Sequence, residues 1–415
     1  MYRIWNFIAQ YSLLLVGGAV IALLWANLAP LGYHHFVETP LWVGAPIGVL
    51  EMHSGVAVRV LTLHFLINDV LMALFFAMAA KEVWEAVVMP NGALRGRKAL
   101  TPLIATLGGM LGPVAVYLGL SAALGILPAV AGGWAVPTAT DIAFSYLVGR
   151  IVFGARHPAI GFLLLLAIAD DAGGLAILAI FYPSGEIAPA WLLLSVLAAV
   201  AVYLLANWLP RRTDRDTARA ATTWVRKHLT FWPYLIAGMI SWYAFYRAGL
   251  HPALGLLPIV VTIPHAGQDF GVFAEVERYN TDLLNTIEHA LKVPVQIILL
   301  LFGLVNAGVE FGAISALTWT VLFSLLLGKP LGITLFGWFA ARVLRLGLPD
   351  GMRMADLPVV GVVAAIGFTV ALFVASVAFP AGPMQDAAKM GALFSLACCV
   401  PAVVVGRLLG VKRAA

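Results

Sequence analysis

Residues 162–180 read Phe-Leu-Leu-Leu-Leu-Ala-Ile-Ala-Asp-Asp-Ala-Gly-Gly-Leu-Ala-Ile-Leu-Ala-Ile, an apolar run of the length that crosses a lipid bilayer. Two neighbouring carboxylates, Asp170 and Asp171, lie about halfway along this run. A charge at the centre of a membrane helix costs about 2.5–3.5 kcal/mol on insertion scales, so two cost on the order of 5–7 kcal/mol. The stretch therefore predicts a helical membrane protein with an ionic site inside it.

The composition of the whole chain agrees with this prediction. Of its 415 residues, 62% are hydrophobic and only 11% are charged. Soluble domains average about 45–50% apolar and about 25% charged residues. Because so few charges cannot cover a water-facing surface of this size, we expect residues 1–415 to form a single domain in lipid.

The apolar residues are grouped into stretches of the length that a span needs, roughly 20 residues. About twelve stretches meet this criterion. They lie near residues 11–29, 63–88, 100–124, 134–150, 158–182, 189–209, 229–247, 251–264, 284–307, 315–342, 357–379 and 386–408. We therefore predict an all-α multi-pass membrane protein, in which the eighth stretch is short for a full span.

The basic residues give these spans an orientation, because loops rich in Lys and Arg stay in the cytoplasm. They crowd into alternate loops, and we expect both chain termini in the cytoplasm. The formal net charge of +5 follows from this bias and does not indicate nucleic acid binding. The longest polar stretch, between the sixth and seventh predicted spans, contains Arg211, Arg212, Arg215, Arg219, Arg226 and Lys227.

Residues 34–61, between the first two predicted spans, are neither apolar enough nor long enough to cross the membrane. Extended segments flank a stretch at 44–48 that contains glycine and proline. This pattern favours a β-hairpin on the outer surface. An irregular loop is an equal alternative on the pattern alone.

Asp170 and Asp171 can have different roles because neighbours on a helix point about 100° apart. One carboxylate can face a cation site while the other meets a different group. Their mutual repulsion favours a proton on at least one of them, so the pair can alternate between holding a proton and holding a cation. Lys329, inside the tenth predicted span, is the candidate partner of one aspartate. The structural alternatives are a fully paired, stabilising cluster and a simple ion pair.

Two predicted spans are interrupted in their apolar patterns. In the fourth, Pro137, Thr138 and Thr140 weaken the helical hydrogen bonds beside Asp141. In the eleventh, Gly367 and Thr369 lie in the middle of the span. Interrupted spans in corresponding places of two halves indicate a binding site built by inverted repeats. The partial charges of half-helix ends at that depth need compensation. Asp141 could balance the positive ends, and Lys329 the negative ends.

Other ionisable residues lie near span ends, where a long side chain can reach water, and their structural and functional interpretations both stay open. These residues are Asp69, Lys81, Glu82, Glu288 and Lys292.

Several short motifs, found in order along nearly the whole chain, together resemble the bacterial sodium/proton antiporters called the NhaA family. The motifs are Ile-Asn-Asp at 67–69 with Leu-Met-Ala at 71–73 and Phe-Phe at 75–76, Pro-Thr-Ala-Thr-Asp-Ile-Ala-Phe at 137–144, Ala-Asp-Asp at 169–171, Asn-Ala-Gly-Val at 306–309, Gly-Lys-Pro-Leu-Gly-Ile at 328–333 and Ile-Gly-Phe-Thr at 366–369.

The resemblance implies inverted-topology repeats with two crossed discontinuous helices, the fourth and eleventh spans; NhaA antiporters are a known case of such repeats. It implies an ion-binding core bundle near 100–182 and 315–408. An interface or dimerisation part would comprise residues near 11–88 and 229–307.

The resemblance also implies roles for the buried polar residues. Asp171 would be the more direct sodium ligand, and Asp170 would pair with Lys329. Thr140 would be a nearby oxygen ligand. Asp141 would compensate the crossed broken helices.

Further roles follow from the same resemblance. Asp69 and Glu82 would lie on the path between cytoplasm and core, and Glu288 and His289 at a cytoplasmic mouth linked to pH sensing. The hairpin at 34–61 would form the contact of a homodimer.

The chain departs from the family pattern at this predicted mouth. After Glu82 the family continues with a Lys-Arg-Glu cluster, whereas this chain has Trp84, Glu85 and Ala86, preceded by Lys81. Lys292 replaces a usual histidine, and Ala371 replaces a small hydroxyl residue. We therefore do not carry the family's pH activation over to this chain.

The expected function is electrogenic exchange of sodium (or lithium) for protons by alternating access in the bacterial inner membrane, without a cofactor and without enzymatic activity. A hard cation prefers oxygen ligands, which the aspartates and Thr140 offer. One alternative is proton-coupled transport of another solute on the same fold. A second is an intramembrane aspartyl protease using Asp141 and Asp170, although the Gly-x-Gly-Asp pattern is absent. A third is a channel, which would not need a buried lysine.

Overall fold

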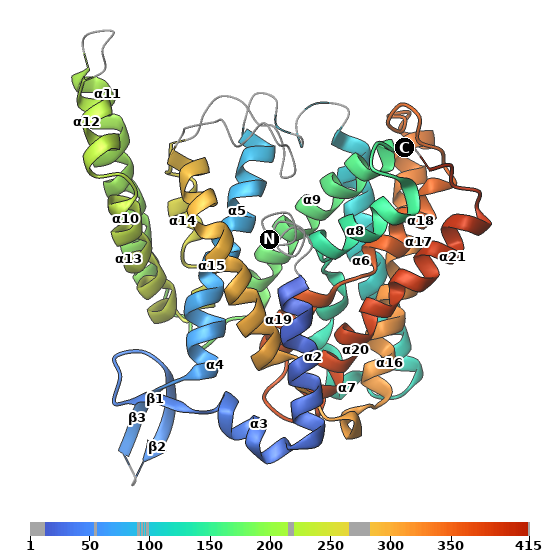
Figure 1. The fold of residues 1–415 in the computed structure, drawn as a ribbon, viewed down its shortest axis with the longest axis horizontal. Helices are drawn as coiled ribbons and strands as arrows, with labels where there is room; N and C mark the ends of the chain where they lie inside the picture. Colours follow the sequence, from blue (N-terminus) through green and yellow to red (C-terminus); the bar gives the residue numbers. More distant parts are fainter. Residues whose placement is uncertain are drawn as a thin grey trace, which may run out of the picture. The chain divides into compact units, whose positions relative to one another are not determined.

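A computed structural model of the chain describes residues 13–53, 56–88, 92, 94, 96, 99–214, 220–264 and 283–413 (Figure 1). Within these residues seven helices are long and apolar enough to cross a membrane, or eight if one bent pair counts as a span. They are Leu63–Val88, Leu100–Ala123, Pro158–Phe181, Pro189–Thr213, Thr286–Asn306, Ala316–Val343 and Pro383–Leu408. A helical membrane protein is thus confirmed, while the count of twelve spans stays a prediction.

The remaining predicted spans contain shorter or broken helices. The first holds α2 (Leu13–Leu28), the seventh holds α13 (Trp232–Ala248), and the eighth holds only η7 (Pro252–Leu254) and α14 (Leu257–Val260). These segments are shorter than a straight span, which reaches about 30 Å across the bilayer at 1.5 Å per residue.

The chain divides into two compact units. Unit 1 comprises Met1–Thr39, Ala93–Ile177 and Leu299–Ala415. Unit 2 comprises Pro40–Gly92 and Leu178–Ile298.

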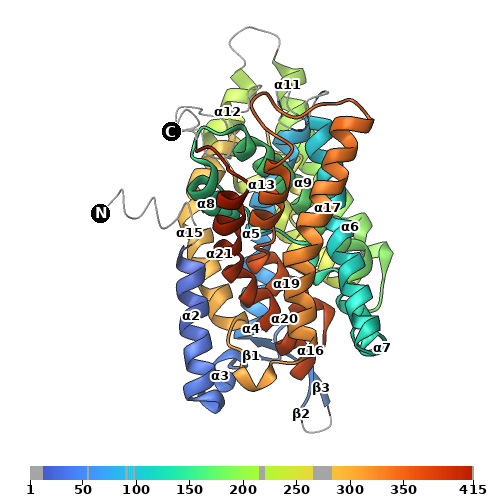
Figure 2. The same ribbon diagram turned by 90° about the vertical axis from the view of Figure 1, so that its right-hand side faces the viewer.

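In unit 1, α6 (Leu100–Ala123) lies side by side with α17 (Lys329–Trp338), as Figure 2 shows. Glycines allow the two backbones to touch: a Cβ on Gly108 would lie 2.2 Å from the Gly332 carbonyl oxygen. Small residues commonly form such close contacts between membrane helices. This packing fixes the position of α17 against α6, and α17 begins at Lys329.

The helix before Lys329 is not regular. A π-helical segment, η10 (Ser324–Gly328), separates α16 (Ala316–Phe323) from α17. Segments of this kind often occur at functional sites. Lys329 therefore lies just after an irregular turn within an otherwise apolar span.

Both predicted interruptions are present in unit 1. In the fourth predicted span the short turn η4 (Val136–Thr138) leads through Ala139, which is extended, to Asp141 at the start of α8 (Ile142–Phe153). In the eleventh, α18 (Asp356–Ala364) and α19 (Phe368–Ala378) meet at a bend of 52°. The Asp141 N–H donates to the Ile366 carbonyl at 2.7 Å, so the two breaks contact each other.

A close contact with Tyr33 in unit 1 explains the glycine of the motif Asn-Ala-Gly-Val at 306–309. The motif follows α15 (Leu283–Asn306), and the Tyr33 hydroxyl donates to the Val305 carbonyl at 2.9 Å and accepts from the Gly308 N–H at 3.1 Å. A Cβ on Gly308 would lie 2.0 Å from the Tyr33 ring. Glycine is therefore required there by the tyrosine of α3 (Pro30–Val37).

In unit 2 a small sheet occupies most of the stretch predicted as a hairpin. Strands β1 (Pro40–Val43), β2 (Val49–His53) and β3 (Val56–Thr62) are antiparallel in the order β1-β3-β2. The irregular loop is thus the wrong alternative, and the hairpin is β2–β3. The prediction was wrong in two respects: a third strand is added beside β3, and residues 34–37 belong to α3.

The sheet is attached to α13 within unit 2. The Arg59 side chain of β3 donates to the Tyr246 hydroxyl and lies over the tyrosine ring, 5.3 Å from its centre. The Tyr246 hydroxyl in turn donates to the Gly48 carbonyl at 2.9 Å. Helices α10 (Leu192–Val202) and α13 are joined by a hydrogen bond of 2.6 Å between the hydroxyls of Ser195 and Ser241.

Candidate functional site

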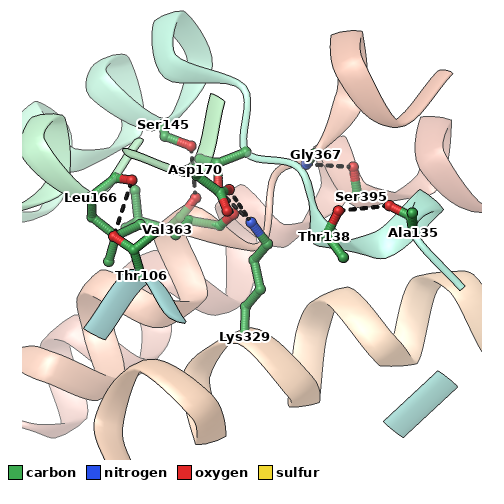
Figure 3. Close-up of polar contacts among 12 residues, drawn as sticks. Thr106, Ala135, Thr138, Ser145, Leu166, Asp170, Lys329, Val363, Gly367 and Ser395 are labelled. Atoms are coloured by element: carbon green, nitrogen blue, oxygen red, sulfur yellow. Dashed lines mark hydrogen bonds and ion pairs between the residues drawn. The ribbon is translucent and has the colours of Figure 1, made fainter. Parts of the chain in front are cut away.

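The centre of the site is a buried ion pair in unit 1. The Lys329 ammonium lies 2.7 Å from Asp170 Oδ2, and the side chains of both residues are almost completely shielded from solvent (Figure 3). The ammonium also donates to the Thr140 hydroxyl. A buried ion pair offsets its desolvation cost only when further hydrogen bonds satisfy its polar atoms. The Lys329 ammonium has such hydrogen bonds to both Asp170 and Thr140.

Asp170 is less well satisfied than its partner. Its second oxygen, Oδ1, is buried and has no hydrogen-bond partner among the residues that the structure describes. Unpaired buried polar atoms are rare in native proteins, and each needs an explanation such as an ion or a proton. One oxygen of Asp170 is thus available to a cation or a proton.

Asp171 differs from Asp170 in its surroundings. It follows Asp170 in α9 (Pro158–Phe181), is only partly buried, and points about 100° away around the helix. Lys329 forms its ion pair with Asp170 but also experiences the charge of Asp171. The two neighbours therefore differ in both exposure and partner.

Asp141 joins the starts of two half-helices. Its Oδ1 accepts from the Phe144 N–H at 3.1 Å and so caps α8. Its Oδ2 accepts from the Thr369 N–H at 3.3 Å and from the Thr369 hydroxyl, in the first turn of α19. A carboxylate between two helix N-termini is favourable because both carry partial positive charge. This geometry fits the charge compensation expected of Asp141.

The opposite half-helix ends with carbonyls that hydroxyls satisfy. The Thr140 hydroxyl donates to the Ala364 carbonyl at 3.1 Å while it accepts from Lys329. Ser145 donates to the Val363 carbonyl at 3.1 Å. Sequence reasoning missed Ser145, because a serine in an apolar run gives no signal of its partner. Lys329 is thus linked through one hydroxyl to the C-terminal end of α18.

Gly367 lies between these groups, at the bend. Its N–H donates to the Ser395 hydroxyl at 3.2 Å. The structure therefore brings most of the predicted site together in unit 1. These residues are Thr140, Asp141, Asp170, Asp171, Lys329, Gly367 and Thr369.

The other predicted residues belong to unit 2, beginning with Asp69. It lies in the π-helical segment η1 (Leu66–Leu71), just after β3, and its carbonyl accepts from the Trp242 indole at 2.8 Å. Its carboxylate is 3.9 Å from His251 Nε2. Asp69 is thus near the sheet end of α5 (Met72–Val88), about 20 Å along the helix axis from Glu82.

A second buried ionic cluster lies toward the other end of α5. The Lys81 ammonium is 2.6 Å from Glu85 Oε2 and 2.6 Å from Glu288 Oε2 of α15. Lys81 and Glu85 are buried, whereas the Glu288 side chain is 19% exposed. His289, the neighbour of Glu288, is exposed. The sequence indicated Glu288 but not its bond to Lys81.

No group of three metal-ligating side chains is found in the described part of the chain. In unit 1, carboxylate and hydroxyl oxygens of Asp170 and Thr140 lie around the Lys329 ammonium.

Comparison with known proteins places the whole chain among sodium/proton antiporters. A family model described as Na+/H+ antiporter 1 matches residues 4–409. The Na(+)/H(+) antiporter NhaA of Jannaschia sp. (strain CCS1) is 66% identical over 417 residues, which cover 100% of this chain and 99% of that protein. Proteins with the same name from Desulfitobacterium hafniense (strain DSM 10664 / DCB-2) and Geobacter sulfurreducens (strain ATCC 51573 / DSM 12127 / PCA) are 46% and 43% identical, over 98% of this chain and 96% and 98% of their own lengths.

Proposed function

This chain belongs to the Na+/H+ antiporter 1 family, and we propose that it exchanges sodium ions for protons across the membrane. The observation that supports this function most directly is the state of Asp170. One of its oxygens is paired with Lys329, and the other is buried without a partner in the described part of the chain. Such an oxygen can hold either a proton or a cation.

In the proposed exchange, sodium ions and protons compete for one set of oxygens. Asp171 is the direct sodium ligand, assisted by Asp170 and Thr140. When the carboxylates hold protons, their negative charge is lost and sodium leaves. When sodium binds, the protons are released to the same side. The exchange is electrogenic because more protons than sodium ions cross the membrane in each cycle. Sodium or lithium is exported from the cytoplasm.

The two broken helices give the site access to either side in turn. We propose that the fourth and eleventh spans cross within a bundle of twelve, with Asp141 and Thr369 at the contact. The contact of both breaks through Asp141 supports this arrangement. The carbonyl end of α18 is linked to Lys329 through the Thr140 hydroxyl, and the positive charge of the lysine is favourable at such an end.

The protein is proposed to lie in the bacterial inner membrane with both termini in the cytoplasm. The sheet then faces outside, and its strands β1 and β2 lie at the two edges, where the strands of a second copy can pair with them. With this orientation Asp69 lies in the outer half of its span. We therefore propose that it lies on the outer path, rather than on the cytoplasmic path expected from the resemblance.

The cluster of Lys81, Glu85 and Glu288, with Glu82 and His289 beside it, then lies toward the cytoplasm. It occupies the place where the family resemblance implies a response to pH. We propose that Glu82, Glu288 and His289 belong to the cytoplasmic mouth and do not bind the transported ion, and that Lys81 and Glu85 hold α5 to α15.

The test uses everted membrane vesicles with an imposed pH gradient and a pH-sensitive dye. Sodium should collapse the gradient, and Asp171→Asn should abolish this response because the main cation ligand is neutralised. Asp350→Asn, a change of an exposed loop carboxylate, is the matched control and should respond like the unchanged protein. Full activity of Asp171→Asn would contradict the mechanism. A response to potassium or an organic solute, but not to sodium, would favour transport of another solute.

A further inference from the structure

Ser395 lies in the middle of the last apolar helix and is 0% exposed. At this residue the helix changes from α20 (Pro383–Phe394) to a 3-10 turn, η12 (Ser395–Cys398), before it continues as α21 (Cys399–Leu408). Its hydroxyl donates to the Ala392 carbonyl at 2.6 Å, which is a bond within its own helix. The same hydroxyl accepts the Gly367 N–H from the broken span, at 3.2 Å (Figure 3).

The Gly367 amide needs this partner. Gly367 precedes α19, and the first amides of a helix have no acceptor inside the helix. Within a bilayer no water replaces the missing acceptor. A Cβ on Gly367 would lie 2.9 Å from the Ala139 carbonyl oxygen, so the two broken stretches are in close contact here. Ser395 therefore satisfies the start of α19 at the point where the two breaks meet.

From Gly367 the contact leads directly to the site. Thr369, two residues later, donates from its N–H and its hydroxyl to Asp141 Oδ2. Both donors belong to the first turn of α19. A shift of that turn would move them away from Asp141, and with them the ends of both half-helices.

The sequence positions of Ser395 and Asp170 correspond. Asp170 lies 12 residues after Pro158, the first residue of α9, and Ser395 lies 12 residues after Pro383, the first residue of α20. Each is a buried polar residue whose side chain bonds to another segment of unit 1. The last helix thus supplies a neutral hydroxyl where α9 supplies a carboxylate.

We propose that Ser395 is a positioning residue of the cation site, which holds the first turn of α19 and thereby the donors of Thr369 against Asp141. It acts through Gly367 and does not touch the aspartates that bind the ion. The inference rests on the proposed exchange of sodium for protons.

The test compares two buried serines. Ser324 is also 0% exposed, and within the described residues its hydroxyl donates to the Thr320 carbonyl at 2.6 Å, inside its own helix, and has no other partner. Ser395→Ala leaves the Gly367 amide without an acceptor, whereas Ser324→Ala leaves no donor unpaired. In everted vesicles at fixed pH, we expect Ser395→Ala to raise the half-maximal sodium concentration about tenfold. Ser324→Ala should stay within about twofold of the unchanged protein.

Rescue variants separate positioning from general damage. Ser395→Thr keeps the hydroxyl and should restore the sodium dependence, and Ser395→Cys, a weaker acceptor, should be intermediate. Melting temperatures of the purified variants show whether Ser395→Ala folds; if it does not, the Cys variant decides. An unchanged half-maximal sodium concentration in the folded variant, or an equal rise in Ser324→Ala, would overturn the proposal. Failure of the unchanged protein to respond to sodium would instead contradict the exchange function itself.

Discussion

Among the described residues, each unit contains a buried ion-pair cluster of a lysine with carboxylates, and the clusters around Lys329 and Lys81 differ in how the charges are matched. In unit 1, Lys329 forms an ion pair with Asp170 and a hydrogen bond with Thr140, while one oxygen of Asp170 stays unpaired in the described structure. In unit 2, Lys81 forms ion pairs with both Glu85 and Glu288 at the same distance of 2.6 Å. One lysine is shared by two carboxylates there.

This difference shows that lysine and carboxylates can either join two helices or form an ion-binding site. A lysine that joins two carboxylates from α5 and α15 holds two helices together. A lysine that saturates only one oxygen of a buried carboxylate leaves negative charge available to a second cation. Composition alone would not separate these cases, because both clusters combine lysine with acidic residues in apolar helices.

The largest effect should come from breaking the cluster of unit 1. Lys329→Met leaves the Asp170 carboxylate buried without a partner, and removing one member of a buried pair costs about 3–5 kcal/mol. We expect a lower melting temperature of the purified protein and no sodium-dependent collapse of a pH gradient in vesicles. The double variant Lys329→Met/Asp170→Asn should regain most of the stability but not the exchange. If the double variant exchanged sodium, the pair would be structural.

A smaller effect is expected from Lys81→Met in unit 2. Two carboxylates lose their partner, but the Glu288 side chain is 19% exposed and water can solvate it in part. The loss of stability should therefore be nearer about 2–3 kcal/mol, at or below the low end for a broken buried pair. Vesicles with equal amounts of protein should retain exchange. The triple variant Lys81→Met/Glu85→Gln/Glu288→Gln, measured in parallel, should recover the melting temperature.

The smallest effect should follow from Glu85→Gln. Lys81 keeps its ion pair with Glu288, and the glutamine oxygen can still accept a hydrogen bond, so the change in stability should be about 1 kcal/mol. The sodium dependence in vesicles should match that of the unchanged protein. Its counterpart in unit 1, Asp170→Asn, should abolish exchange. Loss of exchange in Glu85→Gln would mean that the cluster of unit 2, like that of unit 1, is needed for transport.

Several features could be predicted from the sequence because they follow from local chemistry. The cost of a charge in lipid marks Asp170, Asp171 and Lys329 without any knowledge of their neighbours. The conformational limits of proline and the low cost of irregular backbone at glycine mark the breaks near residues 137 and 367. The short motifs indicated the family, which the comparisons confirm.

Other features depend on packing between segments far apart in the chain. The sequence could not show that Thr140 bridges Lys329 and the end of α18, or that β1 adds to the hairpin. Ser395 gave no signal, because a hydroxyl in a membrane helix usually bonds to its own backbone.

For Asp170 and Asp171, the sequence by itself determined that two charges lie within one apolar helix and need a reason to be there. Only the tertiary structure decided which carboxylate meets Lys329 and which oxygen stays unpaired. The physical reason is that a burial cost depends on the residue and its span, whereas a partner depends on how helices separated by more than a hundred residues pack together.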